Sequence, residues 1–211
     1  MKILNLYAGI GGNRKLWGEN HEITAVEWKK DIAKVYTDNF PNDIMIIGDA
    51  HEYLLEHFAE FDFIWSSPPC PSHSMFRKNF SVNVGAKPLF PDMKLYEEIL
   101  FLKHYFKGKW CVENVKSFYK SLVIPQILQR HYFWTNFYIE EKTIPKDTIN
   151  LTGGRNEDEK EQVDRLEEKI GIDLKKYKGN KQLWLRNCVA PELGKHILLE
   201  SQKEPNSLFK I

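Results

Sequence analysis

The sequence has few cysteines and no long apolar run. Its three cysteines, Cys70, Cys111 and Cys188, are far apart and show no CxxC or Cys/His spacing. This argues against a disulfide framework and against a zinc site. No apolar run reaches the roughly 18 residues that cross a bilayer, and the chain begins with a strand-like segment, not with an apolar leader. We therefore expect a metal-free cytoplasmic protein with no membrane partner, from a prokaryotic or phage-infected cell.

An excess of charge of one sign is also absent. The chain carries 30 Lys and Arg against 29 Asp and Glu, so it is not the basic body typical of a non-specific nucleic-acid binder. Any contact with a polyanion must therefore be local. The length of 211 residues fits one α/β domain with one modest insertion.

Apolar runs typical of strands alternate with patterns typical of helices. Strands are expected at 3–8, 23–28, 43–50, 61–67, 109–115 and 131–139, and helices at 13–20, 31–40, 51–58 and 95–106. This alternation predicts an α/β fold with a doubly wound, mostly parallel sheet.

The character of the sequence changes after residue 142. Between 143 and 181 a turn precedes a charged segment in which Val163, Leu166, Ile170 and Leu174 mark one helix face. Residues 183–199 recover apolar content and are expected to return to the sheet. We therefore predict a main domain over 1–142 and 182–211, with a short insertion at 143–181.

Three glycines, Gly9, Gly11 and Gly12, follow the first expected strand. In an open parallel sheet this is where the ligand crevice forms, and glycine lets the backbone approach a nucleotide-like ligand closely. The spacing is GxGG, not the GxGxxG of dinucleotide folds, so a plain tight turn is the alternative.

Acidic and aromatic residues end the next two expected strands. Glu27 could accept hydrogen bonds from both ribose hydroxyls, Trp28 could stack on adenine, and Asp49 could accept from the adenine amino group. Each acid could instead cap a helix or face solvent. Three successive strand ends with complementary groups favour a cofactor site.

Cys70 lies just past the buried run 61–67, in SSPPCPSHS. The prolines at 68 and 69 fix the backbone and would present the thiol at the crevice, whereas a core cysteine needs no such loop. Glu113 and Asn114 close the strand 109–115 and would emerge at the same sheet edge. A carboxyl group there could protonate or hydrogen-bond a heterocycle nitrogen.

Together these segments resemble the cytosine-C5 DNA methyltransferase family, in the correct order over most of the chain. NLYAGIGG is similar to the family's DLFAGIGG, EW to its acid-aromatic pair, GDA to GDI, SPPC to GPPC, and ENV to ENV. Further on, QILQR resembles QxRxR but has Leu128 in place of the first Arg. RNCVAPELGKHI resembles the late GNSVxPxLAxxI segment.

The resemblance implies an S-adenosylmethionine-dependent enzyme with a Rossmann-like fold that releases S-adenosylhomocysteine. Cys70 would attack C6 of cytosine, Glu113 would engage N3, Asn114 would hold the Glu113 loop, and Arg130 would contact the base or its phosphate. The implied cofactor-binding residues are Tyr7, Ala8, Gly9, Ile10, Gly11, Gly12, Glu27, Trp28, Asp49, Ala50, Pro69 and Asn187. The implied substrate-binding residues are Ser72, Arg77, Gln126 and Arg130.

The implied substrate is DNA, with the target cytosine flipped into the pocket. Residues 75–91, which include Arg77, Lys78 and Lys87, could form a mobile lid over that base or an ordinary exposed loop. A restriction-modification role is one setting for such an enzyme.

Only about 45 residues separate Asn136 from Gln182, where the family carries its target-recognition region. The chain could therefore be a compact DNA enzyme of low specificity, an enzyme that borrows recognition from a partner chain, or an RNA cytosine-C5 methyltransferase. A catalytically silent S-adenosylmethionine- or DNA-binding module would not need Cys70, Glu113 and Arg130 together. Cys70 and the ENV segment also argue against an amino-methyltransferase.

Overall fold

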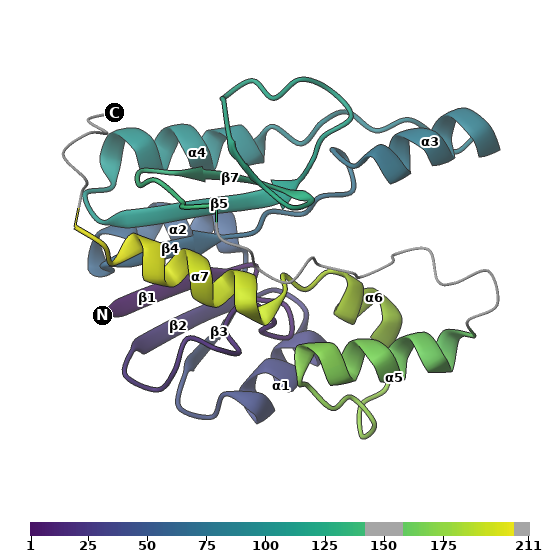
Figure 1. Cartoon of the computed structure of the whole chain (residues 1–211), viewed down its shortest axis with the longest axis horizontal. Helices are drawn as coiled ribbons and strands as arrows, with labels where there is room; N and C mark the ends of the chain where they lie inside the picture. The colour runs from purple at the N-terminus through teal and green to yellow at the C-terminus, as the bar shows by residue number, and fades with distance from the viewer. Residues whose placement is uncertain (142–157, 205–211) are drawn as a thin grey trace.

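The computed structural model describes residues 1–141 and 158–204. A seven-stranded sheet in the order β3-β2-β1-β4-β5-β7-β6 forms its centre (Figure 1). The strands are β1 (Lys2–Leu6), β2 (Glu22–Glu27), β3 (Ile44–Ile47), β4 (Phe63–Ser66), β5 (Lys109–Val115), β6 (Gln126–Leu128) and β7 (His131–Thr135). Five strands, β1 to β5, run parallel, whereas β7 is antiparallel to both β5 and β6. The predicted doubly wound, mostly parallel sheet is confirmed.

The strand order reverses beside β1, which lies between β2 and β4. Leu6, the last residue of β1, pairs with Val26 on one side and with Ser66 on the other. Strands on both sides of this point therefore end at the same edge of the sheet. In an open α/β sheet, this edge is where a ligand crevice forms.

Helices cover both faces of the sheet (Figure 1). Those helices are α1 (Lys30–Asn39), α2 (Ala50–His57), α4 (Lys94–Tyr105) and α7 (Pro191–Ser201), and a 3-10 turn spans Phe58–Glu60. The side chains of α2 and α4 pack in one apolar cluster, and those of α7 and α1 contribute to clusters on the other face. Within the described ranges, no helix has the length and apolar character needed to cross a membrane.

The central strands are apolar on both sides because both faces of the sheet are covered. In β4, Phe63 and Trp65 pack toward α7, while Ile64 packs toward α2 and α4. All three side chains are fully buried. This is why 61–67 reads as a continuous apolar run and not as an alternating one.

The charged segment after residue 158 forms two helices, α5 (Glu159–Ile170) and α6 (Lys181–Arg186). The predicted apolar face is confirmed, because Leu166, Ile170 and Leu174 are buried against Ile10 and Val35 of the main domain. Residues 143–157 of the expected insertion lie outside the described residues. The proposed division into domains stays a prediction.

The predicted helix at 13–20 is wrong, because this stretch consists of turns. Buried polar pairs hold it: Asn13 donates to the side chain of Asn5 at 2.8 Å, and the Arg14 Nε donates to Asp43 at 2.8 Å. Gly194 of α7 also approaches the backbone of Asn13 so closely that a Cβ there would lie 2.2 Å from its carbonyl oxygen. Specific polar partners and close packing override the local helical pattern.

Two other regions differ in extent from the expectation. The strand expected at 131–139 ends at Thr135, and the short strand β6 beside it was not foreseen. The segment expected to be a lid begins with a helix, α3 (Met75–Val84), which Ser74 caps at its start and Gly85 ends in a left-handed conformation. Three-residue strands and helices without a buried face leave little periodicity to detect.

Candidate functional site

A cavity of about 290 Å³ opens beyond the ends of β1, β2 and β3. Six of the residues expected to bind a cofactor line it: Tyr7, Glu27, Trp28, Asp49, Ala50 and Pro69. Four more lining residues were not foreseen: Val26, Gly48, Asp92 and Lys94. The carboxyl-end edge of the sheet therefore holds a cavity at the position that the strand-end pattern indicated.

Glu27 and Trp28 present two different surfaces to this cavity. Glu27 is buried, and its carboxylate accepts hydrogen bonds from the backbone N–H of Gly9 at 3.1 Å and of Lys29 at 3.0 Å. Burial raises the pKa of Glu27 despite these bonds. The Trp28 side chain is 70% exposed, so its ring is open to a planar ligand.

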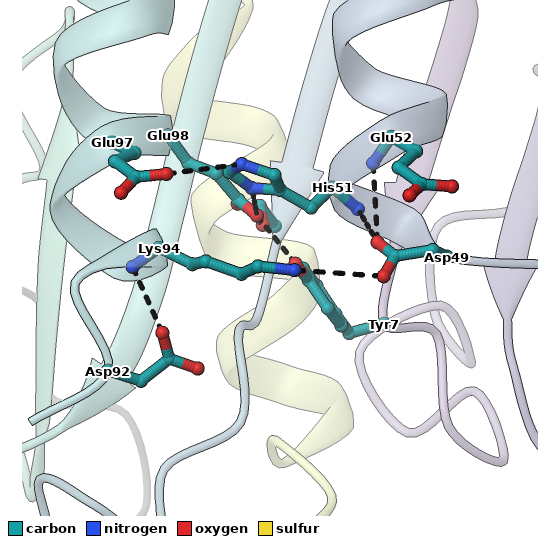
Figure 2. A network of polar contacts seen from close by, with 9 residues as sticks. Tyr7, Asp49, His51, Glu52, Asp92, Lys94, Glu97 and Glu98 are labelled. Carbon is teal, nitrogen blue, oxygen red and sulfur yellow. Dashed lines mark hydrogen bonds and ion pairs between the residues drawn. The ribbon is translucent and has the colours of Figure 1, made fainter. Parts of the chain in front are cut away.

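Asp49 has two roles in the structure (Figure 2). It caps α2 by accepting from the backbone N–H of His51 and Glu52, so the helix-cap alternative holds for it. Burial opposes ionisation of Asp49, but these two bonds, together with the charges of Lys94 and His51, outweigh it and lower the pKa of Asp49. The other carboxylate oxygen lies 3.7 Å from the Nζ of Lys94, whose side chain reaches across from the start of α4 (Figure 2).

A buried carboxylate, which the sequence pattern did not indicate, lies beside the cavity. Glu98 of α4 has a fully buried side chain and accepts from the Tyr7 hydroxyl at 2.6 Å and the Ser66 hydroxyl at 2.5 Å (Figure 2). His51 Nδ1 lies 3.0 Å from it, and this hydrogen bond raises the pKa of His51. Burial and then the charge of Glu98 raise the pKa of Tyr7. These contacts fix Tyr7, which has a positive φ of 54°, in the cavity wall.

The sequence at the start of α4 could have indicated the unforeseen lining residues Asp92 and Lys94. Asp92 accepts from the backbone N–H of Lys94 at 3.1 Å, a local bond typical of the residue before a helix. Because α4 leads into the parallel strand β5, its first turn must lie at the carboxyl-end edge of the sheet. Polar residues at that helix start therefore belong with the strand-end residues.

The glycine loop divides into one open position and two packed ones. A Cβ on Gly9 would meet nothing within 4 Å, whereas one on Gly11 would lie 2.3 Å from the Phe40 ring and one on Gly12 would lie 2.7 Å from Cys188. Ala8 and Ile10 are buried in apolar clusters. Gly11 and Gly12 thus allow the loop to pack inside the protein, and only Gly9 faces open space.

Asn187 lies outside the cavity lining, although it was expected to help complete the cofactor site. It is exposed and forms the C-terminal cap of α6, donating its backbone N–H to Leu183. The following residues, Cys188 and Val189, contact Gly12 of the first loop. The late segment therefore contacts the glycine loop through Cys188 and Val189.

The loop after β4 holds Cys70 in a compact turn. The backbone N–H groups of His73 and Ser74 both donate to the Cys70 carbonyl. Asn114 at the end of β5 donates its side-chain amide to the Pro68 carbonyl at 2.9 Å, and this bond is buried. Asn114 therefore ties the cysteine loop to the strand that carries Glu113.

The electrostatics of Cys70 show which groups surround it. Burial first, and then the negative charge of Glu113, raise the pKa of Cys70 to about 11, whereas the positive charge of Arg130 acts in the opposite direction. The structure thus brings together three residues that come from three separate segments of the sequence. At neutral pH the thiol is held in its protonated form, and ionisation requires added positive charge or loss of the Glu113 charge.

Glu113 has an unforeseen partner. His131, the first residue of β7, places its Nδ1 2.6 Å from the Glu113 Oε1. The two side chains are only 4% and 8% exposed. A carboxyl group with one oxygen engaged in this way keeps its other oxygen for a ligand.

The residues expected to bind substrate have different surroundings. The Ser72 hydroxyl accepts from the backbone N–H of Asp92, and Arg77 donates to the carbonyl of Lys87 at 2.9 Å. Gln126 uses its amide to bond Thr135, Phe137 and Ile139. The contacts of Gln126 are therefore internal to the β6–β7 region, and a role in substrate binding stays untested.

Helix α3 leaves the body of the protein beside the cysteine loop. It has no buried residue, and Phe76 and Phe80 stack on its exposed surface with ring centroids 6.3 Å apart. Both α3 and the α5–α6 pair extend past the end of the sheet at which the parallel strands finish (Figure 1). Between 75 and 91 the chain has three basic residues and no acidic one.

The comparisons with known proteins agree with this geometry. The sequence profile of the C-5 cytosine-specific DNA methylases matches residues 1–130. This range begins before β1 and ends at Arg130, so it contains the cavity, the cysteine loop and the Glu113 strand. A comparison with curated proteins gave no match.

Solved structures similar to this one include methyltransferases. Spodoptera frugiperda DNMT2, solved as a mutant, is 28% identical over 57% of this chain and 37% of its own, with a TM-score of 0.40. A SAM-dependent methyltransferase from Agrobacterium tumefaciens is 14% identical over 56% of this chain and 40% of its own, with a TM-score of 0.38. The chain therefore spans well under half of either protein. A hypothetical protein from Thermus thermophilus has a TM-score of 0.43 at 15% identity over 64% of this chain and 73% of its own.

Proposed function

This chain belongs to the C-5 cytosine-specific DNA methylase family, and we propose that it transfers a methyl group from S-adenosylmethionine to C5 of cytosine in DNA through a covalent bond to Cys70. The observation that carries this proposal is the buried hydrogen bond from Asn114 to the Pro68 carbonyl, which ties the Cys70 loop to the strand of Glu113. The charges of Glu113 and Arg130 both act on the pKa of the thiol. A module that only binds needs no such group of residues. Membership of the family supports methylation of cytosine at C5. The DNA substrate and the covalent bond to Cys70 are what we propose beyond it.

The residues around the cavity fit S-adenosylmethionine. The exposed Trp28 ring can stack on adenine, and Glu27 keeps unused lone pairs for ribose hydroxyls beside its two backbone bonds. Asp49 is ionised and lines the same cavity, where it can accept from an amino group. When bound, the cofactor supplies an electrophilic methyl group.

The proposed chemistry begins at the thiol. Cys70 gives its proton to solvent, and Sγ bonds to C6 of cytosine while Glu113 donates a proton to N3, so that the electron pair of the C5–C6 double bond makes C5 nucleophilic. C5 then takes the methyl group, which leaves S-adenosylhomocysteine. A base removes the C5 proton, the electron pair restores the C5–C6 double bond as the Sγ–C6 bond breaks to release the thiolate, and Glu113 recovers its proton from N3. Because the pKa of Cys70 is about 11 in the free protein, formation of the thiolate is favoured by protonation of Glu113, which removes its negative charge, and by the positive charge of Arg130.

DNA as the substrate is supported by the surface next to Cys70. The segment 75–91 carries Arg77, Lys78 and Lys87 with no acid, and α3 also exposes aromatic rings, which suits contact with phosphates and unstacked bases. We propose that α3 approaches the DNA around a flipped cytosine. Recognition of a target sequence would come from the 143–181 region or from a partner chain.

The test is transfer of labelled methyl groups from S-adenosylmethionine to mixed-sequence duplex DNA and, separately, to RNA, with the product nucleosides resolved by mass. We expect 5-methylcytosine in DNA and less than about one percent of that activity in Cys70→Ala, because no other side chain replaces the nucleophile. Cofactor affinity should stay within about twofold, since the thiol acts on the base and not on the cofactor.

Two outcomes would contradict the proposal. Label in RNA alone would refute the DNA substrate. Turnover of Cys70→Ala above a few percent of the wild-type rate would refute covalent catalysis, even if 5-methylcytosine forms.

A further inference from the structure

Glu113, which has a central role in the proposed chemistry, forms a buried pair with His131. Glu113 and His131 lie on neighbouring antiparallel strands, where His131 pairs in register with Val115 and Glu113 with Phe133. Their side chains therefore meet diagonally across the two strands. The Nδ1 to Oε1 distance of 2.6 Å is that of a short hydrogen bond.

Glu113 has to present its proton in one direction. A carboxyl group can carry its proton on either oxygen and can rotate, so only some of its states aim an O–H at N3 of a bound cytosine. An N–H donor held against one oxygen makes that oxygen an acceptor and leaves the proton on the other one. Such preorganisation lowers the cost of reaching the transition state.

We propose that His131 is a positioning residue for the methylation reaction: its Nδ1–H donates to Oε1 of Glu113 and thereby keeps the acid proton on Oε2, which faces cytosine. This inference rests on the proposed function and deepens it. His131 keeps its own proton throughout, while the Oε2 proton moves to N3 as the Sγ–C6 bond forms and returns when that bond breaks. His131 therefore neither gains nor loses a proton in the cycle.

The surroundings of the pair hold the two side chains in place. Both side chains are almost completely buried, so the bond is shielded from water and persists. The His131 ring lies 6.1 Å from the Phe133 ring on the same strand, which restricts its movement. The charge of the same carboxyl group acts on the pKa of Cys70. Glu113 therefore bears both on N3, which it would protonate, and on the thiol that would attack C6.

Two substitutions matched in polarity test the proposal. In His131→Asn the side-chain NH₂ occupies nearly the position of Nδ1 and can still donate to Oε1. In His131→Gln the NH₂ is carried one bond further, near the position of Nε2. We expect kcat of the Gln variant to fall roughly tenfold to a hundredfold and the Asn variant to stay within about fivefold of wild type. The KM for S-adenosylmethionine should change by less than about twofold in both.

A second comparison, made in a protein that already carries Glu113→Gln, shows whether His131 acts on kcat by way of Glu113. In Glu113→Gln, which cannot supply the proton, His131→Gln should add less than about a twofold further loss. Thermal unfolding of each variant, followed by circular dichroism, confirms that the compared proteins are folded. If His131→Gln does not fold, His131→Phe, which keeps a ring but has no N–H donor, takes its place and should show the same loss of kcat.

Three results would overturn the proposal. They are a kcat of His131→Gln equal to wild type, equal losses in folded Asn and Gln variants, and a full additional loss in the Glu113→Gln background. These results differ from a failure of the proposed function. In that case the wild-type protein itself makes no 5-methylcytosine, and no His131 variant need be measured.

Discussion

The two halves of the crevice are built differently. At the ends of β1, β2 and β3 the cavity is lined by the exposed groups Trp28 and Asp49 beside the buried Glu27. At the ends of β4 and β5 and the start of β7, Cys70 is partly buried, and Glu113 and His131 are almost inaccessible. The half that we propose binds the cofactor is therefore open, whereas the half that we propose acts on the base holds the Cys70 thiol protonated at neutral pH.

This difference has a chemical meaning. A contact made equally with the bound ground state and the transition state affects affinity when it is removed, whereas a group that acts on the bonds that change affects rate. We expect the residues of the open half to belong to the first kind and Cys70 and Glu113 to the second. The predictions that follow test this separation, beginning with the largest effect.

Replacing Glu113 by Gln should have the largest effect. The amide cannot donate a proton to N3, so we expect kcat for 5-methylcytosine formation to fall by about 10² to 10⁴. Cofactor affinity, measured by calorimetry, should not change by more than about twofold. Glu22→Gln, an exposed acid at the opposite edge of the sheet, is the matched control. A loss of cofactor affinity as large as the loss of rate would mean that the two halves are not separate.

The reactivity of Cys70 should depend steeply on pH. A thiol with a pKa raised to about 11 is ionised in roughly one molecule in a thousand at pH 8, and this fraction rises about tenfold per pH unit below the pKa. Alkylation by iodoacetamide, followed by mass spectrometry of the Cys70 peptide, should therefore accelerate about tenfold per unit between pH 7 and pH 10.

Glu113→Gln should accelerate the same alkylation at pH 8, because it removes a negative charge that raises the pKa of Cys70. The fully buried Cys111 serves as an internal reference that should remain unmodified in the folded protein. A rate of Cys70 alkylation that is constant above pH 7 would contradict the described burial.

Trp28→Ala tests the open half. Loss of a stacking ring should weaken S-adenosylmethionine binding by about tenfold, equivalent to about 1.4 kcal/mol, while kcat at saturating cofactor changes little. The melting temperature should stay the same because the ring is 70% exposed. Tyr105→Ala, at the far end of α4, removes another exposed aromatic ring and should leave binding unchanged. Equal effects of the two substitutions would exclude a stacking role for Trp28.

The smallest effect is expected at Asp49, where two substitutions separate its two roles. Asp49→Ala removes the cap of α2 and should lower the free energy of unfolding by about 1 kcal/mol. Asp49→Asn keeps a capping oxygen and should be nearly as stable as wild type, although both variants lose the ion pair with Lys94. Urea denaturation measures the difference. Equal destabilisation by both would show that charge, not capping, is what stabilises this helix start.

Most of the sheet could be predicted from the sequence because each parallel strand is apolar on both faces. β4 and β5 show this most clearly, and the sequence also placed Cys70 and Glu113 at the same edge of the sheet as their ends. The loop after β1 could not be predicted, because its shape depends on Arg14 pairing with the distant Asp43. No local pattern contains that partner.

The candidate site shows the same limit. Residues at strand ends were found because the topology fixes where strands end. Glu98 and His131 were missed because their importance comes from what they contact: Tyr7 and Ser66 in one case, and Glu113 in the other. The close packing around Gly11 and Gly12, where an added Cβ would meet Phe40 or Cys188, also depends on partners that are distant in the sequence. A side chain's partner, unlike its strand position, becomes known only from the fold.

The most direct measurement of the central claim is a trapping experiment with duplex DNA in which cytosine is replaced by 5-fluorocytosine. Fluorine at C5 cannot leave as the proton does, so a covalent route predicts a protein–DNA adduct that survives denaturation and requires S-adenosylmethionine. Mass spectrometry should locate the adduct on Cys70, and Cys70→Ala should form none. Methylation of ordinary cytosine without any adduct on the fluorinated DNA would contradict nucleophilic attack by Cys70.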